Sequence, residues 1–523
     1  MRLGRIAQDE HEGPHVTHTM DRRRFLEVTA CAALAACGGG GDSGHDPAPP
    51  PDAQIDKAIA ELDGIAASLM QRSGLPGMAV AVVRGGRKVY AKGFGTRELG
   101  THLPVDADTV FQLASVSKPI GATVVARQVG LGRVQWDTRL RSLLPWFALS
   151  SPQASEAVTI ADMYAHRSGL PEHAGDRLED MGYDRRAVLE RLRYYPLMPL
   201  REHYDYTNFG MTAAAEAVTI AAKTDWATLS EATLYQPLGM TRTTSRYADF
   251  LQQPNRARGH VKYTGTWQVS AIPRDADAQS PAGGVSSSVD DLAKWMAMVM
   301  GRGMHEGRRI VDEAALQACV TPQMSSGGPN DNYGFGFIVG VTPRGRTVLT
   351  HSGAFALGAG TTFRMVPSAD VGIVVLTNGY PIGIAEAASL AFFDIVETGS
   401  VQRDWLAVVS PSFEELLAPE GSLVGVPRPA NPAPPSRPLA GYAGVYGNAL
   451  YGAATIALEG GSLVLTIGPA PLRLPLSHWD GDVFTFTLRN ENATPGTISK
   501  ATFDGDRVTL EYYDREGLGT FVQ

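Results

Sequence analysis

A serine and a lysine stand three residues apart in a mostly apolar stretch of the chain. Residues 111–120 read FQLASVSKPI, so Ser115 precedes Lys118 by one helical turn. The apolar spacing after Ser115 predicts a helix that runs to about Gln128. A lysine buried there must find partners or lose its proton, and such a lysine can activate a neighbouring nucleophile. The pair predicts covalent catalysis through Ser115, although S-x-x-K alone is a weak motif.

A tyrosine and an asparagine farther along the chain could complete the proton chemistry. The pattern Y-x-N begins at Tyr206 and again at Tyr446. The first copy ends at Asn208 and opens an apolar helical run, which predicts that both polar side chains lie where a loop enters a helix. The second copy lies among short strand-like runs and indicates turn chemistry. Tyr206 and Asn208 are therefore the candidates.

A third motif would place a polar residue on a strand facing the serine. The pattern H-x-G begins at His11, His173, His305 and His351. Three of these copies lie in tail or loop sequence, and only His351 follows a strand-like run, at 346–350. Context rather than the letters therefore selects His351.

One apparent metal motif is rejected. Residues 11–15 read HEGPH, which fits the zinc pattern H-E-x-x-H letter for letter. That pattern binds zinc only from a helix, and Pro14 cannot lie inside one. We expect neither a metal nor an organic cofactor.

Two blocks of strand-like sequence flank a mostly helical region and must position these residues. A helix is expected from about Gln54 to Gln71, and residues 77–95 read as two strands joined by a tight turn. Strand-like runs return at 333–340, 346–351, 361–366 and 371–378, before a helical pattern at 383–397. The predicted fold is α/β (α+β): one antiparallel sheet flanked by helices and closed by both ends of the domain, with an inserted helical lobe.

Composition shifts divide the rest of the chain. Residues 38–52 form a Gly/Pro tether, 53–398 the main domain, and 399–438 a proline-rich linker. Short alternating runs over 439–523 predict a small all-β barrel or sandwich.

The first 37 residues predict export. Arg22 and Arg23 precede a short apolar run that ends in LAAC, which combines a twin-arginine-like signal with a lipobox. We expect cleavage before Cys37 and lipidation of its thiol, which makes the mature protein a periplasmic or envelope-anchored bacterial lipoprotein. An ordinary signal peptide with a chance cysteine is the alternative, and Met1 and Met20 are both candidate starts.

Composition excludes several partner classes. The chain has 523 residues, a formal net charge of −8 and a pI near 5.9, and 44% of its residues are hydrophobic. This balance is typical of a globular protein with more than one domain and argues against nucleic-acid binding. The apolar run within the signal is too short to cross a bilayer, so membrane contact is expected only through Cys37. Cys319 is then left without a disulfide partner, and packing is its expected role.

The ordered motifs resemble the serine β-lactamase superfamily, in the branch of class C β-lactamases, DD-peptidases and related esterases. The motifs are FQLASVSK (111–118), MYAHRSGLP (163–171), YTNFG (206–210), PAGGVSSSVDDLAKW (281–295), YGFGF (333–337) and HSG (351–353). The resemblance covers roughly 53–398, and the C-terminal module is loosely similar to the lipocalin-like domains appended to some members.

The resemblance implies a mechanism for Ser115, which would attack a carbonyl and form an acyl-enzyme that water later hydrolyses. Tyr206 is the family's candidate for accepting the serine proton. A phenolate at pH 7 costs about 4 kcal/mol, which a Lys118 cation at about 4 Å would offset. No cofactor is implied.

The resemblance also implies how the substrate is held. Asn208 would bind its acyl side, and the backbone N–H groups of Ser115 and Ala354 would form the oxyanion hole beside Gly353. β-Lactamases usually carry lysine at this position. This chain has His351 instead, and a histidine there is also found in some DD-peptidases and many esterases of the superfamily. A neutral imidazole gives little attraction for a carboxylate but could orient Tyr206 through a hydrogen bond.

We therefore expect hydrolysis of esters or of small, peptidoglycan-like peptides rather than of β-lactams. Two alternatives remain: a penicillin-binding or sensing protein that acylates without turnover, and a ligand-binding envelope lipoprotein whose C-terminal domain is the functional part.

Overall fold

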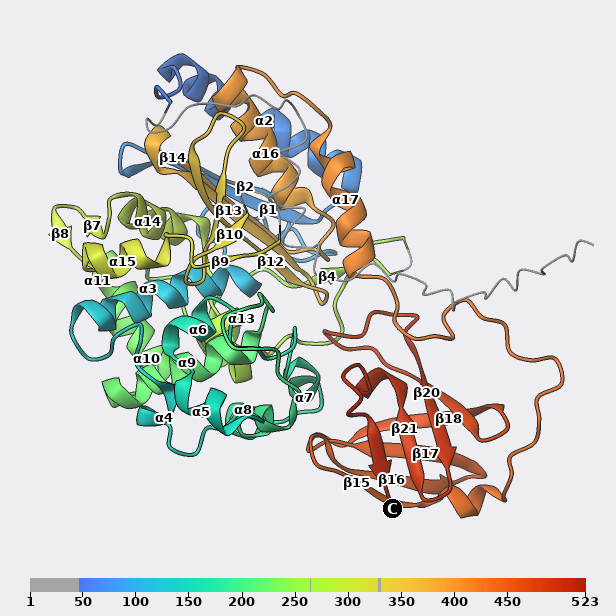
Figure 1. Cartoon of the computed structure of the whole chain (residues 1–523). Helices are drawn as coiled ribbons and strands as arrows, with labels where there is room; N and C mark the ends of the chain where they lie inside the picture. The colour runs from blue at the N-terminus through green and yellow to red at the C-terminus, as the bar shows by residue number, and fades with distance from the viewer. Residues whose placement is uncertain (1–46, 264, 328–330) are drawn as a thin grey trace, which may run out of the picture.

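The computed structural model describes residues 47–263, 265–327 and 331–523. Its centre is an eight-stranded antiparallel sheet in the order β2-β1-β14-β13-β12-β11-β10-β9 (Figure 1). The strands are β1 (Gly77–Arg84), β2 (Arg87–Gly95), β9 (Met324–Ser325), β10 (Asn332–Tyr333), β11 (Ile338–Val341), β12 (Thr347–Phe355), β13 (Ala359–Val366) and β14 (Val371–Thr377). Because β1 pairs with β14 from Met78 to Arg84, strands from both ends of the domain close one sheet, as the sequence predicts.

The turn between β1 and β2 has the geometry that its two glycines favour. Gly85 and Gly86 have φ values of 61° and 67°, and a two-residue loop with both residues left-handed matches the twist of paired strands. The expected hairpin at 77–95 is confirmed.

Helices cover both faces of the sheet. Helices α2 (Asp52–Ser73) and α16 (Ile384–Thr398) pack against each other, and α16 also packs on β13 and β14 (Figure 1). Helix α14 (Val289–Met300) packs on β1, β2 and β14. β1 is buried from Gly77 to Val83, as a strand covered on both faces must be.

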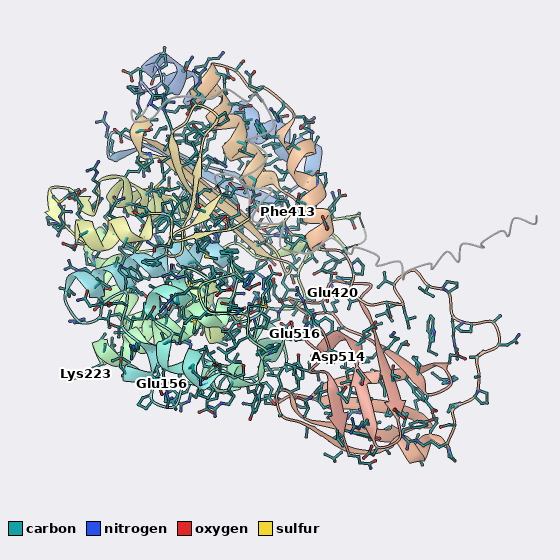
Figure 2. All side chains as sticks on the ribbon, in the orientation of Figure 1. Glu156, Lys223, Phe413, Glu420, Asp514 and Glu516 are labelled. Carbon is teal, nitrogen blue, oxygen red and sulfur yellow. The ribbon has the colours of Figure 1, made fainter. Side chains whose placement is uncertain are left out.

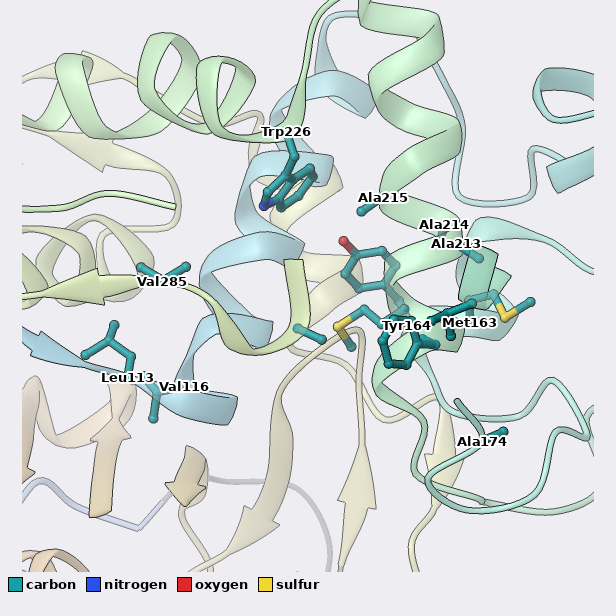
Figure 3. Packing of buried hydrophobic residues seen from close by; sticks show 14 of the residues in the cluster. Leu113, Val116, Met163, Tyr164, Ala174, Ala213, Ala214, Ala215, Trp226 and Val285 are labelled. Atoms are coloured by element: carbon teal, nitrogen blue, oxygen red, sulfur yellow. The ribbon is translucent and has the colours of Figure 1, made fainter. Parts of the chain in front are cut away.

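The inserted helical lobe follows β2 and carries the candidate serine. Its helices are α3 (Ser117–Gly130), α4 (Leu140–Leu143), α5 (Pro152–Ala157), α6 (Ile160–Tyr164), α7 (Asp176–Asp180), α8 (Arg185–Arg191), α9 (Asn208–Ala222), α10 (Trp226–Ser230), α11 (Gln236–Leu238), α12 (Tyr247–Gln252), α13 (Ser280–Gly283) and α15 (Glu313–Cys319). Apolar side chains from α6, α9 and α10 pack around α3 in one continuous core (Figure 3). The core holds Met163, Tyr164 and Val116, and Trp226 lies against Gly121 of α3, so α3 is anchored on several sides.

The proline-rich linker contains a helix that the sequence analysis did not predict. Helix α17 (Trp405–Leu416) includes Pro411 and buries Trp405, Val409 and Phe413 in the cluster beneath α16. These apolar residues recur every fourth position, which is a helical signal that the surrounding prolines obscured.

The C-terminal segment forms a closed barrel. Its strands are β15 (Gly444–Asn448), β16 (Gly452–Glu459), β17 (Ser462–Ile467), β18 (Leu472–Asp480), β19 (Val483–Thr487), β20 (Ile498–Asp504), β21 (Arg507–Leu510) and β22 (Thr520–Val522). The barrel lies beside α7 of the helical lobe (Figure 1). Asn448, of the second Y-x-N, accepts hydrogen bonds from the N–H groups of Leu450 and Tyr451, the expected turn chemistry.

The structure bears on only part of the expected export signal. The predicted signal, its lipobox and Cys37 lie outside the described residues. Cys319 is a buried free thiol, in accord with a packing role. Among the described residues, no helix combines the length and apolar character needed to span a membrane.

Candidate active site

Ser115 lies on a tight turn rather than inside the helix that the sequence predicts. Residues Ala114–Val116 form a 3₁₀ turn and α3 begins at Ser117. Ala114 has a φ of 48°, a left-handed conformation that is unusual for alanine and that clusters at functional sites.

Gly353 allows a strand to approach this turn closely. A Cβ at position 353 would lie 2.2 Å from the carbonyl oxygen of Leu113 and 3.0 Å from the backbone nitrogen of Ser115. Any larger residue would push β12 away from the serine. The role of Gly353 is therefore to let the backbone of β12 pass beside Ser115, next to Ala354, which lines the same cavity as the serine.

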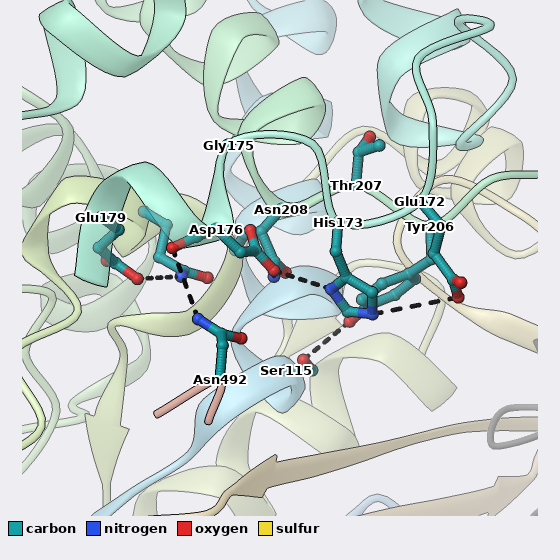
Figure 4. A network of polar contacts seen from close by, with 12 residues as sticks. Ser115, Glu172, His173, Gly175, Asp176, Glu179, Tyr206, Thr207, Asn208 and Asn492 are labelled. Carbon is teal, nitrogen blue, oxygen red and sulfur yellow. Dashed lines mark hydrogen bonds and ion pairs between the residues drawn. The ribbon is translucent and has the colours of Figure 1, made fainter. Parts of the chain in front are cut away.

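Lys118 is fully buried and its amine is surrounded by acceptors. Its Nζ lies 3.0 Å from Ser115 Oγ, 2.6 Å from Asn208 Oδ1 and 3.0 Å from the carbonyl oxygen of Ala282. Nζ donates to Asn208 and Ala282; as a charged ammonium it also donates to Ser115 Oγ, and as a neutral amine its lone pair can accept the Ser115 hydroxyl proton. Tyr206 in turn donates its hydroxyl to Ser115 Oγ over 2.7 Å (Figure 4). The predicted trio of Ser115, Lys118 and Tyr206 is brought together.

Burial favours the uncharged forms of both proton carriers. It lowers the pKa of Lys118 to about 7, although the charge of Asp176 opposes the shift. Burial also raises the pKa of Tyr206 above its ordinary value, against the effect of the Ser115 hydrogen bond. These directions are the reverse of the ammonium–phenolate pair expected from the sequence. The Lys118 amine is therefore the better proton acceptor.

Tyr206 is held in place by a buried imidazole. The ring of His166 lies 4.6 Å from that of Tyr206, centroid to centroid. The backbone N–H of Thr207 donates to His166 Nδ1 over 3.1 Å. Burial lowers the pKa of His166, so this ring stays neutral and can accept that bond.

Asn208 uses both ends of its amide inside the protein. Its Oδ1 accepts from Lys118, and its Nδ2 donates to Asp176 Oδ2 over 2.8 Å. The same carboxylate oxygen lies 2.7 Å from His173 Nδ1 (Figure 4). The resemblance had implied that Asn208 binds substrate; although Asn208 lines the cavity, its amide links Lys118 to Asp176 and His173.

His351 lies beneath the site rather than in it. It is completely buried, and its Nδ1 bonds the carbonyl oxygen of Ser352 over 2.7 Å. Its Nε2 lies 2.9 Å from the hydroxyl of Tyr333, so Tyr333 is its hydrogen-bond partner in place of the expected Tyr206. Burial lowers the pKa of His351 to about 3. The expected hydrogen bond from His351 to Tyr206 is not made, because both ring nitrogens are engaged elsewhere.

A cavity of about 510 Å³ opens beside Ser115. The lobe contributes His173, Tyr206 and Asn208 to its walls, and the barrel contributes Tyr451 and Asn492. Figure 2 places Glu420 and Glu516, both from the C-terminal part of the chain, at the boundary between lobe and barrel. The C-terminal domain is thus part of the cavity wall.

The sequence analysis missed His173 and Asp176. It set His173 aside because its H-x-G lies in a loop. The available signal was the concentration of polar residues in EHAGD (172–176) directly after MYAHRSGLP. Across the described ranges, no group of three or more His, Cys, Asp or Glu residues could hold a metal ion.

Comparison with known proteins agrees with this geometry. A family model described as "Beta-lactamase" matches residues 62–390. The chain belongs to the beta-lactamase family. A second model, "Domain of unknown function (DUF3471)", matches residues 428–513, which include most of the barrel.

Curated relatives are hydrolases and penicillin-binding proteins. Unguisins hydrolase ungD of Aspergillus violaceofuscus is 26% identical over 79% of this chain and 80% of its own length. Penicillin-binding protein 4 of Amycolatopsis lactamdurans is 28% identical over 71% of this chain and 93% of its own. D-alanyl-D-alanine-carboxypeptidase/endopeptidase AmpH of Escherichia coli is 22% identical over 61% and 84%. The protein is a serine hydrolase of this family.

Solved structures confirm the fold. The octameric penicillin-binding protein homologue from Pyrococcus abyssi superimposes with a TM-score of 0.58 at 20% identity, over 87% of this chain and 98% of that one. A class C beta lactamase from Rhodobacter sphaeroides gives 0.54 at 21% identity, over 64% and 98%. The predicted fold class is confirmed.

Proposed function

We propose that this protein hydrolyses esters or small peptides through an acyl-enzyme on Ser115. The observation that carries the proposal is the position of Ser115 Oγ, 3.0 Å from Lys118 Nζ and 2.7 Å from the Tyr206 hydroxyl, beside a cavity. Lys118 accepts the serine proton as Oγ attacks, and Tyr206 stabilises the attacking oxygen. The N–H groups of Ser115 and Ala354 hold the oxyanion.

The charge of the cavity supports neutral substrates over β-lactams. Three arginines line it, and each faces a carboxylate: Arg177 with Glu420 at 3.1 Å, Arg274 with Glu179 at 2.9 Å, and Arg515 with Glu172 at 3.4 Å. A substrate carboxylate would have to compete with these partners. The names of two relatives, a hydrolase and a carboxypeptidase/endopeptidase, favour peptides. The pairing of the three arginines, rather than those names, favours an ester or amide whose binding requires no carboxylate.

A fluorophosphonate probe and a substrate panel test this proposal. Intact-protein mass spectrometry should show one adduct, absent in Ser115→Ala. Short esters and D-amino-acid peptides should turn over, while a chromogenic cephalosporin reacts slowly. Adduct on the Ser115→Ala variant would contradict the nucleophile. Acylation of the wild type without turnover of any ester or peptide would favour the penicillin-sensing alternative.

Export as a lipoprotein is proposed from LAAC and the Gly/Pro tract behind it. Wild-type protein made in a bacterial host should partition into detergent, and Cys37→Ser should abolish that partitioning. Wild-type protein found only in the aqueous phase would contradict lipidation.

A further inference from the structure

We propose that His173, oriented by Asp176, is the second acid–base residue of the site: it protonates the leaving group and then takes a proton from the hydrolytic water. This inference rests on the proposed function, because it assigns proton transfers within the same acyl-enzyme cycle. Three features of the loop between α6 and α7, and of Asp176 at the start of α7, carry it: the bond to Asp176, the strained backbone, and the charge of the network.

The first feature is the way Asp176 fixes the imidazole. Asp176 Oδ2 lies 2.7 Å from His173 Nδ1, and a carboxylate can only accept there. The proton of a neutral His173 therefore lies on Nδ1, and Nε2 carries the lone pair. His173 lines the cavity that contains Ser115, and its side chain is 33% exposed. The second ring nitrogen, Nε2, lies 4.0 Å from Glu172 Oε1, beyond hydrogen-bond distance (Figure 4). An imidazole held by a carboxylate at one nitrogen, with the other nitrogen not hydrogen-bonded, is the arrangement used for acid–base catalysis.

The second feature is a backbone that holds His173 against Tyr206. His173 has a φ of 60°, and its N–H donates to the carbonyl oxygen of Tyr206 over 2.8 Å. Its ring lies 5.7 Å from the Tyr206 ring, centroid to centroid, and Tyr206 bonds Ser115 directly. A left-handed non-glycine residue persists where the surrounding structure demands it. Here it places the His173 ring beside Tyr206, which is the residue that bonds the nucleophile Ser115.

The third feature is the charge balance around Asp176. This carboxyl group is buried, and its Oδ1 has no hydrogen-bond partner within the described structure. Its other oxygen touches His173 on one side and, through Asn208, Lys118 on the other. A buried negative charge needs one nearby positive charge. One proton shared between His173 and Lys118 supplies it.

The catalytic cycle preserves this balance at every step. Acylation starts with the shared proton on His173 Nε2 and the neutral amine at Lys118. In acylation Ser115 Oγ bonds the acyl carbon and its proton passes to Lys118, while the bond to the leaving group breaks and that group takes the Nε2 proton of His173. In deacylation water gives a proton to Nε2 and its oxygen bonds the acyl carbon. The bond to Oγ then breaks, and Lys118 returns the proton to Ser115.

The substitution His173→Asn tests the assignment with the least disturbance, because asparagine enters the left-handed region more readily than most residues. With p-nitrophenyl acetate, whose leaving group departs without an acid, the variant should keep an initial burst of about one equivalent of nitrophenol at pH 9, where Lys118 is the neutral amine. Its steady-state rate should fall about 100-fold, the scale of one lost general base. Mass spectrometry should show the acetyl group retained on Ser115. Hydroxylamine, which attacks without a base, should raise the steady-state rate at least tenfold.

The exposed His203, at the rim of the same cavity, supplies the matched control. His203→Asn should keep kcat within about twofold of the wild type. If His173→Asn turns over within about threefold of the wild type, or loses burst and steady state equally with no response to hydroxylamine, His173 is not an acid–base residue. If the wild type hydrolyses no ester or peptide, that result contradicts the proposed function and not the role of His173. The wild type is therefore assayed first.

Discussion

Two copies of the pattern His-x-G flank the nucleophile in space, and their histidines occupy opposite environments. His351 lies on strand β12, fully buried, with both ring nitrogens bonded to neighbours. His173 lies on a loop beside α7, lines the cavity and has one ring nitrogen on a carboxylate. The strand contributes close backbone approach through Gly353, whereas the loop contributes titratable side chains. In this molecule the rigid strand positions the site and the loop supplies its second set of polar groups.

The largest expected effect concerns the loop. Asp176→Asn should lower kcat for alkyl esters by about 100- to 1000-fold, because it removes the charge that His173 and Lys118 share. The double variant with His173→Asn should be no slower than about the slower single variant, since both changes break one unit. By contrast, His351→Gln combined with His173→Asn should multiply the single effects. Steady-state kinetics of the wild type and the five variants measure both couplings. A multiplicative loss for Asp176 and His173 would show that these two residues act independently.

The strand histidine should respond in stability instead. His351→Lys would place an ammonium where the described partners are a hydroxyl and a carbonyl, and an uncompensated buried charge costs about 3–5 kcal/mol. His173→Asn should change the free energy of unfolding by less than about 1 kcal/mol. Urea denaturation measures both. A stable His351→Lys protein with faster cephalosporin turnover would revive the sequence-based view that a charge at 351 faces the substrate.

The third expected effect is a shift in pH dependence. The acylation burst needs the Lys118 amine, and burial lowers the pKa of Lys118 to about 7, so the burst rate should rise as pH increases through about 7. The negative charge of Asp176 opposes the lowering. Asp176→Asn should therefore lower the pKa further and move the rise to more acidic pH. His351→Gln should leave it unmoved. Stopped-flow bursts with p-nitrophenyl acetate between pH 5 and 9 report this step alone, and equal shifts in both variants would contradict the argument.

The contrast also shows what the sequence could reveal. Local patterns predicted the hairpin at 77–95, the closing sheet and the trio of Ser115, Lys118 and Tyr206, because each depends on spacing along one or two elements. The use of His351 and His173 depends on which neighbours bury each ring. Tyr333 comes from another strand, so nothing in the H-x-G at His351 indicates it. Asp176 lies three residues after His173, but the letters EHAGD alone do not show that its carboxylate bonds the ring. The predicted ionisation states of Lys118 and Tyr206 were wrong for the same reason, because the full burial of both side chains is a tertiary property.

The barrel contacts both the α7 region that carries Asp176 and the chain just beyond strand β12, and it uses a different side chain for each. Asn492 Nδ2 donates to Asp180 Oδ2 over 2.8 Å, at the end of α7. Glu491 Oε1 accepts from the N–H of Ala356 over 2.8 Å, just beyond β12. One barrel loop thus steadies both the helix that carries Asp176 and the chain that follows Ala354.

The smallest expected effects come from removing these supports one at a time. Asn492→Ala should loosen α7 and slow deacylation about three- to tenfold while sparing the burst. One hydrogen bond to a carboxylate contributes about 1.5–3 kcal/mol, and only part of that free energy serves to hold the His173 loop in position. Glu491→Ala should slow the burst itself by a similar factor, because it frees the chain that follows Ala354. Burst and steady-state rates measured on the same samples separate the two steps. Identical profiles for Asn492→Ala and Glu491→Ala would show that the barrel acts on the cavity as a whole. The separate roles of strand β12 and of the His173 loop would then not extend to the barrel residues that support them.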